Sequence, residues 1–258
     1  MLIQASICMK IKLVIIFLLS VGGFTKSNSQ QNSAVSSPAT DSVYTFKKAS
    51  GDGIGKFYMG REIAHIMGPG GSAWLERDNR NIEENTNLSI EKINLPVNGV
   101  VADIGAGTGY YSFKLSGKVP QGKVFAVEIQ DEMISNLRNK KLLLKDSVVE
   151  IIKGSNHSPN LPDNSIDLAI MVDVYHELDF PAEMLQAIRK ALKQNGKLLL
   201  IEFRGEDPAV HIKALHKTTV AQLNRELKAN GFQLNYRGEF LPIQHFLLYE
   251  KNNIVTEK

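Results

Sequence analysis

An acid followed by three glycines at alternate positions is the part of this sequence best suited to bind a ligand. In the stretch VVADIGAGTGYYSFKL, Asp103 precedes Gly105, Gly107 and Gly109. Glycine permits a tight turn and lets the backbone approach a ligand closely. The spacing differs from the dinucleotide pattern G-x-G-x-x-G, whose third glycine would fall on Tyr110. A carboxylate here would repel a pyrophosphate and attract a cation, so the pattern favours a cofactor with a positively charged tail over NAD.

The elements that must hold this loop follow from the apolar pattern. Several runs rich in Val, Ile and Leu are apolar almost throughout, as parallel strands covered on both faces should be. These runs occupy residues 100–104, 123–128, 148–153, 166–172 and 197–203. Helical patterns separate them, so the glycine loop lies at the carboxyl end of the first strand. That is where an open α/β sheet binds its ligands.

Helix boundaries and the C-terminal segment complete the predicted fold. Asp179 is expected to cap a helix that has Pro181 in its first turn and ends at Asn195-Gly196. A later helix is expected to begin with a capping box made by Thr219 and Gln222. The runs FQLNYRGE and IQHFLLYE are typical of an antiparallel pair. Five βα units followed by this hairpin predict an α/β fold with a doubly wound, mostly parallel, seven-stranded sheet.

Four stretches, in order along the chain, resemble the class I S-adenosylmethionine-dependent methyltransferases. They are VADIGAGTGYYSFKL, KVFAVEIQDEMISNL, NLPDNSIDLAIMVDVYHEL and ALKQNGKLLLIEF. They look like motif I, the second strand with its ribose-binding acid, the region leading into the fourth strand, and the LKPGG motif. The resemblance runs from Val100 to about Lys251 and points to the small-molecule and quinone-type members. It implies a Rossmann-like fold and S-adenosyl-L-methionine as the cofactor.

The same resemblance implies roles for individual residues. Asp103 is expected to hold the amino group of the cofactor, directly or through water, and Asp173 to lie near its methionine part. Glu128 can accept two hydrogen bonds from the ribose diol, or it is a solvated acid at a strand end. The family usually has an acid where this chain has Ser155 and Asn156, so a neutral side chain must make the adenine contact. The residues expected to touch the cofactor are Asp103, Gly105, Ala106, Gly107, Gly109, Glu128, Ile129, Ser155, Asn156 and Asp173.

The segment DVYHEL after the fourth strand lies where the family presents residues to the methyl group. A hydroxyl or protonated amine acceptor needs a base to remove its proton, and a neutral imidazole is available near pH 7. His176 is therefore a candidate general base, and packing or hydrogen bonding is its alternative role. Tyr175 either closes over the acceptor or belongs to the core. Asp179 is expected to be the helix cap rather than a catalytic acid.

Residues 54–96 are expected to form an N-terminal helical lid over cofactor and substrate, as in other members of the family. The lid carries the only tryptophan of the chain. The candidates for substrate contact are Tyr58, Arg61 and Trp74, with His65 and Arg77 as further ones. Packing of the lid onto the sheet is the alternative role of these side chains.

The segment HIKALHKTT is expected to form the opposite wall of the site. Its two histidines, His211 and His216, are five positions apart and suggest a metal site. No third ligand follows nearby, so no metal is expected.

The N-terminus has the pattern of a targeting segment. Lys10 and Lys12 precede the apolar run LVIIFLLSVGGF, as in a secretory signal peptide. We expect residues 1–26 to be a signal peptide or membrane anchor, 27–53 a disordered linker, and 97–251 the methyltransferase domain. The protein is then exported, periplasmic or anchored facing outward, and it is cytoplasmic if the segment is not a functional signal.

The expected function is methyl transfer from S-adenosylmethionine to a small molecule, with an apolar one among the options. A protein or peptide methyltransferase is one alternative. A non-catalytic module that binds S-adenosylmethionine or a nucleotide is another, because the cofactor is made in the cytosol. A formal net charge of +3 gives no argument for nucleic acid as a partner, and contact with a membrane is expected only through the N-terminal segment. The sequence leaves the oligomeric state open.

Overall fold

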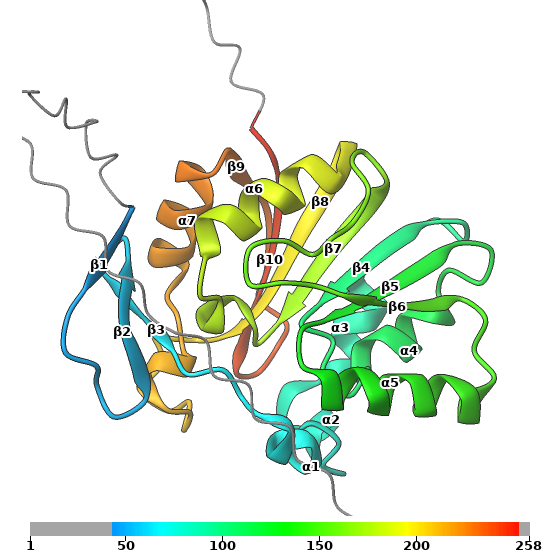
Figure 1. Ribbon diagram of the computed structural model, residues 1–258, viewed down its shortest axis with the longest axis horizontal. Coiled ribbons are helices and arrows are strands. Elements are labelled where there is room, and N and C mark those ends of the chain that lie inside the picture. The colour runs from blue at the N-terminus through cyan, green and yellow to red at the C-terminus, as the bar shows by residue number, and fades with distance from the viewer. Residues whose placement is uncertain (1–42, 253–258) are drawn as a thin grey trace, which may run out of the picture. The chain divides into compact units, whose positions relative to one another are not determined.

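A seven-stranded sheet forms the centre of the protein, whose residues 43–252 are described by a computed structural model. Its order is β6-β5-β4-β7-β8-β10-β9 (Figure 1). The strands are β4 (Val100–Ile104), β5 (Lys123–Glu128), β6 (Val149–Lys153), β7 (Ile166–Val172), β8 (Leu192–Phe203), β9 (Phe232–Gly238) and β10 (Gln244–Lys251). Strands β4 to β8 pair in parallel, whereas β10 is antiparallel to both β8 and β9. The predicted doubly wound sheet with its terminal hairpin is confirmed.

Helices cover both faces of this sheet and build one apolar core on each face. The helices are α3 (Thr86–Lys92), α4 (Tyr110–Ser116), α5 (Asp131–Leu144), α6 (Pro181–Ala191) and α7 (Val220–Ala229). On one face, Ile188 of α6 and Leu223 of α7 pack against the strands. On the other face, Leu115 of α4 and Leu137 of α5 do so. This double coverage explains why the parallel strands are apolar on both sides.

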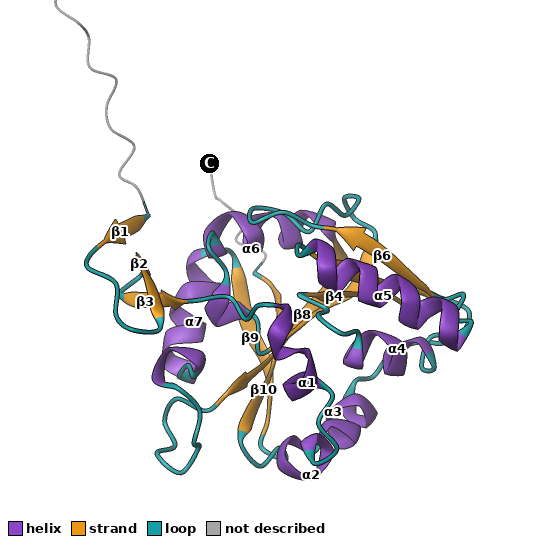
Figure 2. Ribbon diagram, turned by 60° about the horizontal axis from the view of Figure 1, so that its bottom comes forward, coloured by secondary structure: helices purple, strands orange, loops and turns teal. Residues whose placement is uncertain are grey.

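The N-terminal part of the predicted lid is a small antiparallel sheet rather than a helix. It contains β1 (Tyr44–Phe46), β2 (Gly53–Tyr58) and β3 (Arg61–Ala64), and Figure 2 shows it next to α7. Met59 and Gly60 have φ values of 47° and 92°, and two positive φ values suit a two-residue hairpin turn. The predicted lid over 54–96 is therefore wrong in its first part, and the predicted linker over 27–53 is wrong where it overlaps β1.

The helical part of the lid begins after this sheet. It consists of a 3-10 turn η1 (Pro69–Gly71), α1 (Ser72–Leu75) and α2 (Arg80–Glu84), and it continues into α3. Figure 2 shows α1 and α2 beside the end of the main sheet. Residues 65–96 thus correspond to the predicted lid.

Two details of the helix termini differ from expectation. Phe180, not Asp179, is the N-cap of α6, and Asp179 instead accepts a hydrogen bond from Asn156 Nδ2 at 2.9 Å. Helix α6 ends at Ala191, so Asn195-Gly196 lies within β8. At α7, Thr219 Oγ1 accepts the predicted hydrogen bond from the N–H of Gln222 at 3.1 Å.

The expected signal peptide or anchor, and the expected linker as far as residue 42, lie outside the described residues. Among residues 43–252, no helix is both long enough and apolar enough to span a bilayer.

Candidate functional site

The glycine loop lies where the strand order of the main sheet reverses. β4 pairs with β5 on one side and with β7 on the other, and the chain turns away from the sheet after each strand. Ligands of open α/β sheets bind in the crevice at such a point. A cavity of about 600 Å³ opens there, within the range of roughly 300–1,000 Å³ found for small-molecule sites.

The cavity brings together most of the residues predicted to touch a cofactor. Its walls include Gly105, Gly107, Glu128, Ile129, Ser155, Asn156 and Asp173. Three predicted contacts, Asp103, Ala106 and Gly109, are not among the described residues that line it. The structure therefore places the exposed side of the loop at the cavity and the other three residues behind it.

Gly105 and Gly107 have the tight-turn backbone conformation for which glycine was predicted in this loop. Their φ values are +73° and +54°, in the left-handed region that residues with a Cβ rarely adopt. A Cβ on Gly105 would lie 2.7 Å from the Val174 methyl groups. Gly109 has another role, because a Cβ there would lie 2.7 Å from Leu137 Cδ2 and closer still to Phe113. Gly109 thus allows close helix packing rather than contact with a ligand.

Glu128 fixes the glycine loop and is almost fully buried. Its Oε2 accepts a hydrogen bond from the N–H of Gly107 at 2.9 Å. Its Oε1 accepts from the N–H groups of Ile129 at 2.7 Å and Gln130 at 2.9 Å. A carboxylate has about four acceptor positions, so about one is left for a ligand hydroxyl. The carboxylate therefore serves both the loop and the cavity.

Asp103 lies beneath the glycine loop rather than in the cavity wall. It is buried, and its Oδ2 accepts a hydrogen bond from Ser112 Oγ at 2.6 Å. Burial raises the pKa of Asp103 to about 6, although the hydrogen bonds from Ser112 oppose this effect. A buried carboxyl with a raised pKa gains its charge more readily when a cation binds nearby.

Asp173 presents a carboxylate oxygen that lacks a partner. Its Oδ2 accepts a hydrogen bond from Gln244 Nε2 at 2.7 Å, while its buried Oδ1 has no hydrogen-bond partner among residues 43–252. Burial raises the pKa of Asp173 well above its usual range. Its φ of +53° is also unusual for a residue with a Cβ. Strained backbone and an unpaired buried acid are both typical of ligand sites.

His176 reaches the cavity, and its contacts favour the alternative role of hydrogen bonding over that of general base. Its Nδ1 lies 2.7 Å from Glu202 Oε2, and its Nε2 lies 3.0 Å from His216 Nδ1. Burial lowers the pKa of His176, but Glu202 and Glu177 outweigh burial and raise it to about 10. An imidazole with this pKa is already protonated at pH 7 and does not accept a proton.

Tyr175 belongs to the core, one of the two alternatives considered for it. It is fully buried, and its hydroxyl donates a hydrogen bond to Glu226 Oε2 at 2.7 Å. It does not contribute to the cavity wall.

Two predicted substrate contacts are structural instead. Arg61 donates from Nε and Nη2 to the two carboxylate oxygens of Glu226, each at 2.9 Å, in a bidentate pair. Tyr58 is buried and accepts a hydrogen bond from Asn230 Nδ2 at 2.6 Å. Both side chains attach the small sheet to α7, so the predicted substrate contact is wrong for each.

Trp74, the third predicted substrate contact, does line the cavity. Its ring lies 6.3 Å from that of Phe203, edge to face, and the Arg77 guanidinium lies 4.1 Å from its ring centroid. His65 lines the cavity as well, whereas Arg77 pairs with Glu83 and Glu84. The lid therefore contributes aromatic surface to the site.

Sequence reasoning missed most of the apolar wall. The side chains that form it include Ile66, Met67, Leu75, Met133, Val174, Leu178, Met184, Phe203 and Ile212. They come from the lid, α5, α6, the end of β8 and the segments after β7 and β8, and no local spacing connects them. Glu177 was missed for a related reason, because nothing in DVYHEL shows that it faces a distant histidine.

Comparison with known proteins agrees with this geometry. The sequence profile of a family described as a methyltransferase domain matches residues 96–249. The chain belongs to this family. The methyltransferase domain is 27% identical over 141 residues to a demethylmenaquinone methyltransferase of Chlamydia muridarum, covering 53% of this chain and 60% of that protein. It is 30% identical over 107 residues to a ubiquinone/menaquinone biosynthesis C-methyltransferase of Pseudomonas putida, covering 40% and 41%.

The methyltransferase domain also resembles solved structures. A SAM dependent methyltransferase from Aquifex aeolicus superposes with a TM-score of 0.67 at 23% identity, covering 71% of this chain and 98% of that one. This likeness shows a shared fold. The chain spans about half the length of the curated relatives it matches.

Proposed function

We propose that the chain transfers a methyl group from S-adenosylmethionine to a small, apolar molecule. The observation that carries the proposal is one cavity with two kinds of wall. Its lining combines the glycine loop, Glu128 and Asp173 with apolar side chains that include Trp74 and Phe203. Polar groups for the cofactor and apolar surface for an acceptor therefore share one space.

The residues of the polar side fit this cofactor. Glu128 keeps about one acceptor position for a hydroxyl, and Asp173 Oδ1 is a buried acceptor without a partner. Asn156 and Ser155 offer neutral polar groups, as the adenine edge requires. The carboxylates favour a cationic ligand over a pyrophosphate. When bound, the cofactor supplies a methyl group on a positively charged sulfur.

The chain itself contributes positioning and exclusion of water. The lid is held over the cavity by a hydrogen bond from the N–H of Met67 to Glu177 Oε2 at 3.1 Å. A second bond runs from Gln130 Nε2 to the carbonyl of Met67 at 3.1 Å. Alignment of two reactants in a fixed geometry can supply roughly 7–11 kcal/mol of barrier reduction. With His176 protonated, positioning is the main contribution of these side chains.

The apolar wall supports a small acceptor over a peptide. A peptide needs an open groove, whereas Trp74, Leu75 and Met67 of the lid close one side of this cavity. One relative is named a demethylmenaquinone methyltransferase and another a ubiquinone/menaquinone biosynthesis C-methyltransferase. An apolar ring compound would suit this wall.

Thermal unfolding of the purified chain tests the cofactor. A ligand that binds only the folded state stabilises it by about 2.7 kcal/mol at a hundredfold excess over its Kd. S-adenosylmethionine or its demethylated product should raise the Tm, and NAD should not. Transfer of a labelled methyl group to a reduced, short-chain quinone analogue then tests the acceptor. Stabilisation by NAD alone would overturn the assignment of the cofactor, and label found only in protein would overturn the small-molecule acceptor.

A further inference from the structure

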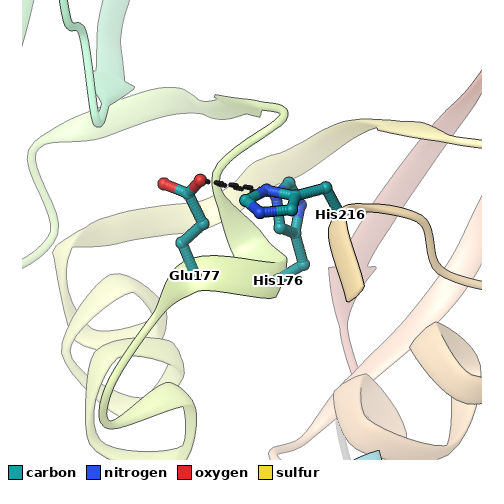
Figure 3. Close-up of side chains that lie close together, drawn as sticks. All are labelled: His176, Glu177 and His216. Carbon is teal, nitrogen blue, oxygen red and sulfur yellow. Dashed lines mark hydrogen bonds and ion pairs between the residues drawn. The ribbon is translucent and has the colours of Figure 1, made fainter. Parts of the chain in front are cut away.

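Three side chains from two distant segments converge at the edge of the cavity. His176 and Glu177 belong to the 3-10 turn η2 (Tyr175–Glu177), and His216 ends the turn η3 (Ala214–His216). Figure 3 shows the two imidazole rings side by side, with the Glu177 carboxylate directed at them. All three side chains line the cavity.

The three nearest ligand atoms form a compact triangle. His176 Nε2 lies 3.0 Å from His216 Nδ1, which lies 3.2 Å from Glu177 Oε1. The third side, from His176 Nε2 to Glu177 Oε1, is 3.7 Å. Ligands about 2.0–2.1 Å from a tetrahedral zinc ion are about 3.4 Å apart. The triangle therefore has the size of one face of a zinc coordination tetrahedron.

Each of the three groups is oriented by a partner on its other side. His176 Nδ1 lies 2.7 Å from Glu202 Oε2, and His216 Nε2 lies 3.1 Å from Asp52 Oδ2. The second oxygen of Glu177 accepts the hydrogen bond from the N–H of Met67. Metal-binding histidines almost always donate their remaining N–H to such a carboxylate or carbonyl. His176 thus has the outer hydrogen bond of a metal ligand, and His216 has a carboxylate within ion-pair distance of its outer nitrogen.

The surrounding charges also favour a cation. Glu177, Glu202 and Asp52 bring three carboxylates to two imidazoles. The positive charge of Lys213 offsets one of these carboxylates, because its Nζ forms an ion pair with Asp52 Oδ1 at 2.7 Å. The Arg61 side chain approaches from the core, where Nη1 donates to the carbonyl of His176 at 3.1 Å, but its charge is paired with Glu226. A divalent ion that displaces the proton of His176 would balance the remaining negative charge.

We propose that His176, Glu177 and His216 bind a divalent transition-metal ion, with zinc as the ion to test. Two imidazoles and one carboxylate leave a coordination position open, as in catalytic zinc sites. The role of the ion rests on the proposed function. The ion would bind a hydroxyl oxygen of the acceptor and favour the deprotonated form of that hydroxyl, with the proton passing to water. The site itself does not depend on that function.

Zinc binding by the purified full chain tests the site directly. After treatment with a chelator, the protein is titrated with zinc by calorimetry, and with cobalt while its visible absorption is recorded. Wild type should bind one equivalent, and cobalt should give the intense bands of tetrahedral coordination. The variants His216→Ala and Glu177→Gln should each weaken zinc by more than about a hundredfold, since loss of an outer partner alone costs about ten- to a hundredfold. His157→Ala is the matched control, because His157 is exposed and stacks on Phe180 away from the triangle.

Folding and function are measured separately. Circular dichroism confirms that each variant is folded. The rise in Tm caused by S-adenosylhomocysteine measures binding at the cofactor end of the cavity, independently of the metal. The metal site is overturned, whatever the activity, if wild type does not bind zinc. It is also overturned if His216→Ala and Glu177→Gln bind zinc with the affinity of wild type. If the site binds zinc, chelation should lower methyl transfer and leave the shift with S-adenosylhomocysteine intact. Zinc binding with no methyl transfer to any acceptor would count against the proposed function, not against the site.

Discussion

Glu128 Oε2 accepts a hydrogen bond of 2.9 Å from the backbone N–H of Gly107, across the gap between β5 and the loop after β4. The same carboxylate holds the first turn of the chain beyond β5 through Ile129 and Gln130. One acid therefore fixes two backbone segments that line the cavity.

Replacement of Glu128 by alanine should weaken binding of S-adenosylmethionine by about 1.5–3 kcal/mol, the usual range for hydrogen bonds to a charged group. Part of the loss arises from the glycine loop, because the N–H of Gly107 loses its acceptor. Calorimetry measures the effect, and Glu91→Ala, an exposed acid on α3, is the control. Unchanged affinity in Glu128→Ala would mean that the ribose is held elsewhere.

Asp103 should make stability depend on pH. Its pKa is about 6 in the folded chain, compared with 3.8 for an unburied aspartate. Because the folded pKa is raised, the protonated form is favoured by the fold. The contribution of Asp103 to the free energy of unfolding, about 3 kcal/mol, is therefore fully present below about pH 3.8. It is lost as the pH rises through about 6.

The variant Asp103→Asn removes this titration. Between pH 4 and pH 8, chemical unfolding without cofactor should show wild type losing stability relative to the variant. S-adenosylmethionine should bind wild type more tightly above pH 6 than below it, because the ionised carboxylate attracts the cation. A stability difference that does not change with pH would contradict the raised pKa.

A methyl group on Gly105 should damage both fold and site. Gly105→Ala places a Cβ 2.7 Å from Val174 at a φ of +73°, and the left-handed conformation alone costs roughly 1–2 kcal/mol. We expect a lower Tm and the loss of the thermal shift with S-adenosylmethionine. Gly51→Ala is the control, since a Cβ there meets no atom within 4 Å. A variant that keeps the full shift would show that the loop need not approach the cofactor.

Arg61 should matter for stability and not for substrate affinity. Its ion pair with Glu226 is buried, with side-chain exposures of 9% and 0%, and removing one partner of such a pair costs about 3–5 kcal/mol. Arg61→Met should therefore unfold at lower denaturant concentration while KM for the acceptor stays the same. The exposed Arg237, which pairs with Glu239, supplies the control Arg237→Met, with an expected cost of about 0–1 kcal/mol. A raised KM at unchanged stability would restore the substrate role.

Export is tested on protein from the native host. N-terminal sequencing should find a mature chain that begins between about Phe24 and Gln31, where small and polar residues follow the apolar run. Intact Met1 in the soluble cytosolic fraction would refute export, and an intact segment in membranes would show an anchor.

The sequence predicted the parts of the protein that depend on local rules. The apolar runs became β4 to β8. The glycine loop lies at the switch point, and its positive φ values explain why glycine occurs there. The hairpin of β2 and β3 was missed because Met59-Gly60 is not a common turn pair. Pairs between distant segments carried no local signal. Arg61 meets Glu226, 165 positions away, and His176 meets His216, 40 positions away, and only the folded chain shows either contact.

Met67 connects the two ends of the cavity through a single residue of backbone. Its N–H donates to Glu177, and its carbonyl accepts from Gln130, which is bound in turn by Glu128. A ligand that moves Met67 at one end must change a hydrogen bond at the other. If both ends are occupied as proposed, coupling through Met67 must be reciprocal: the factor by which the cofactor alters zinc affinity equals the factor by which zinc alters cofactor affinity.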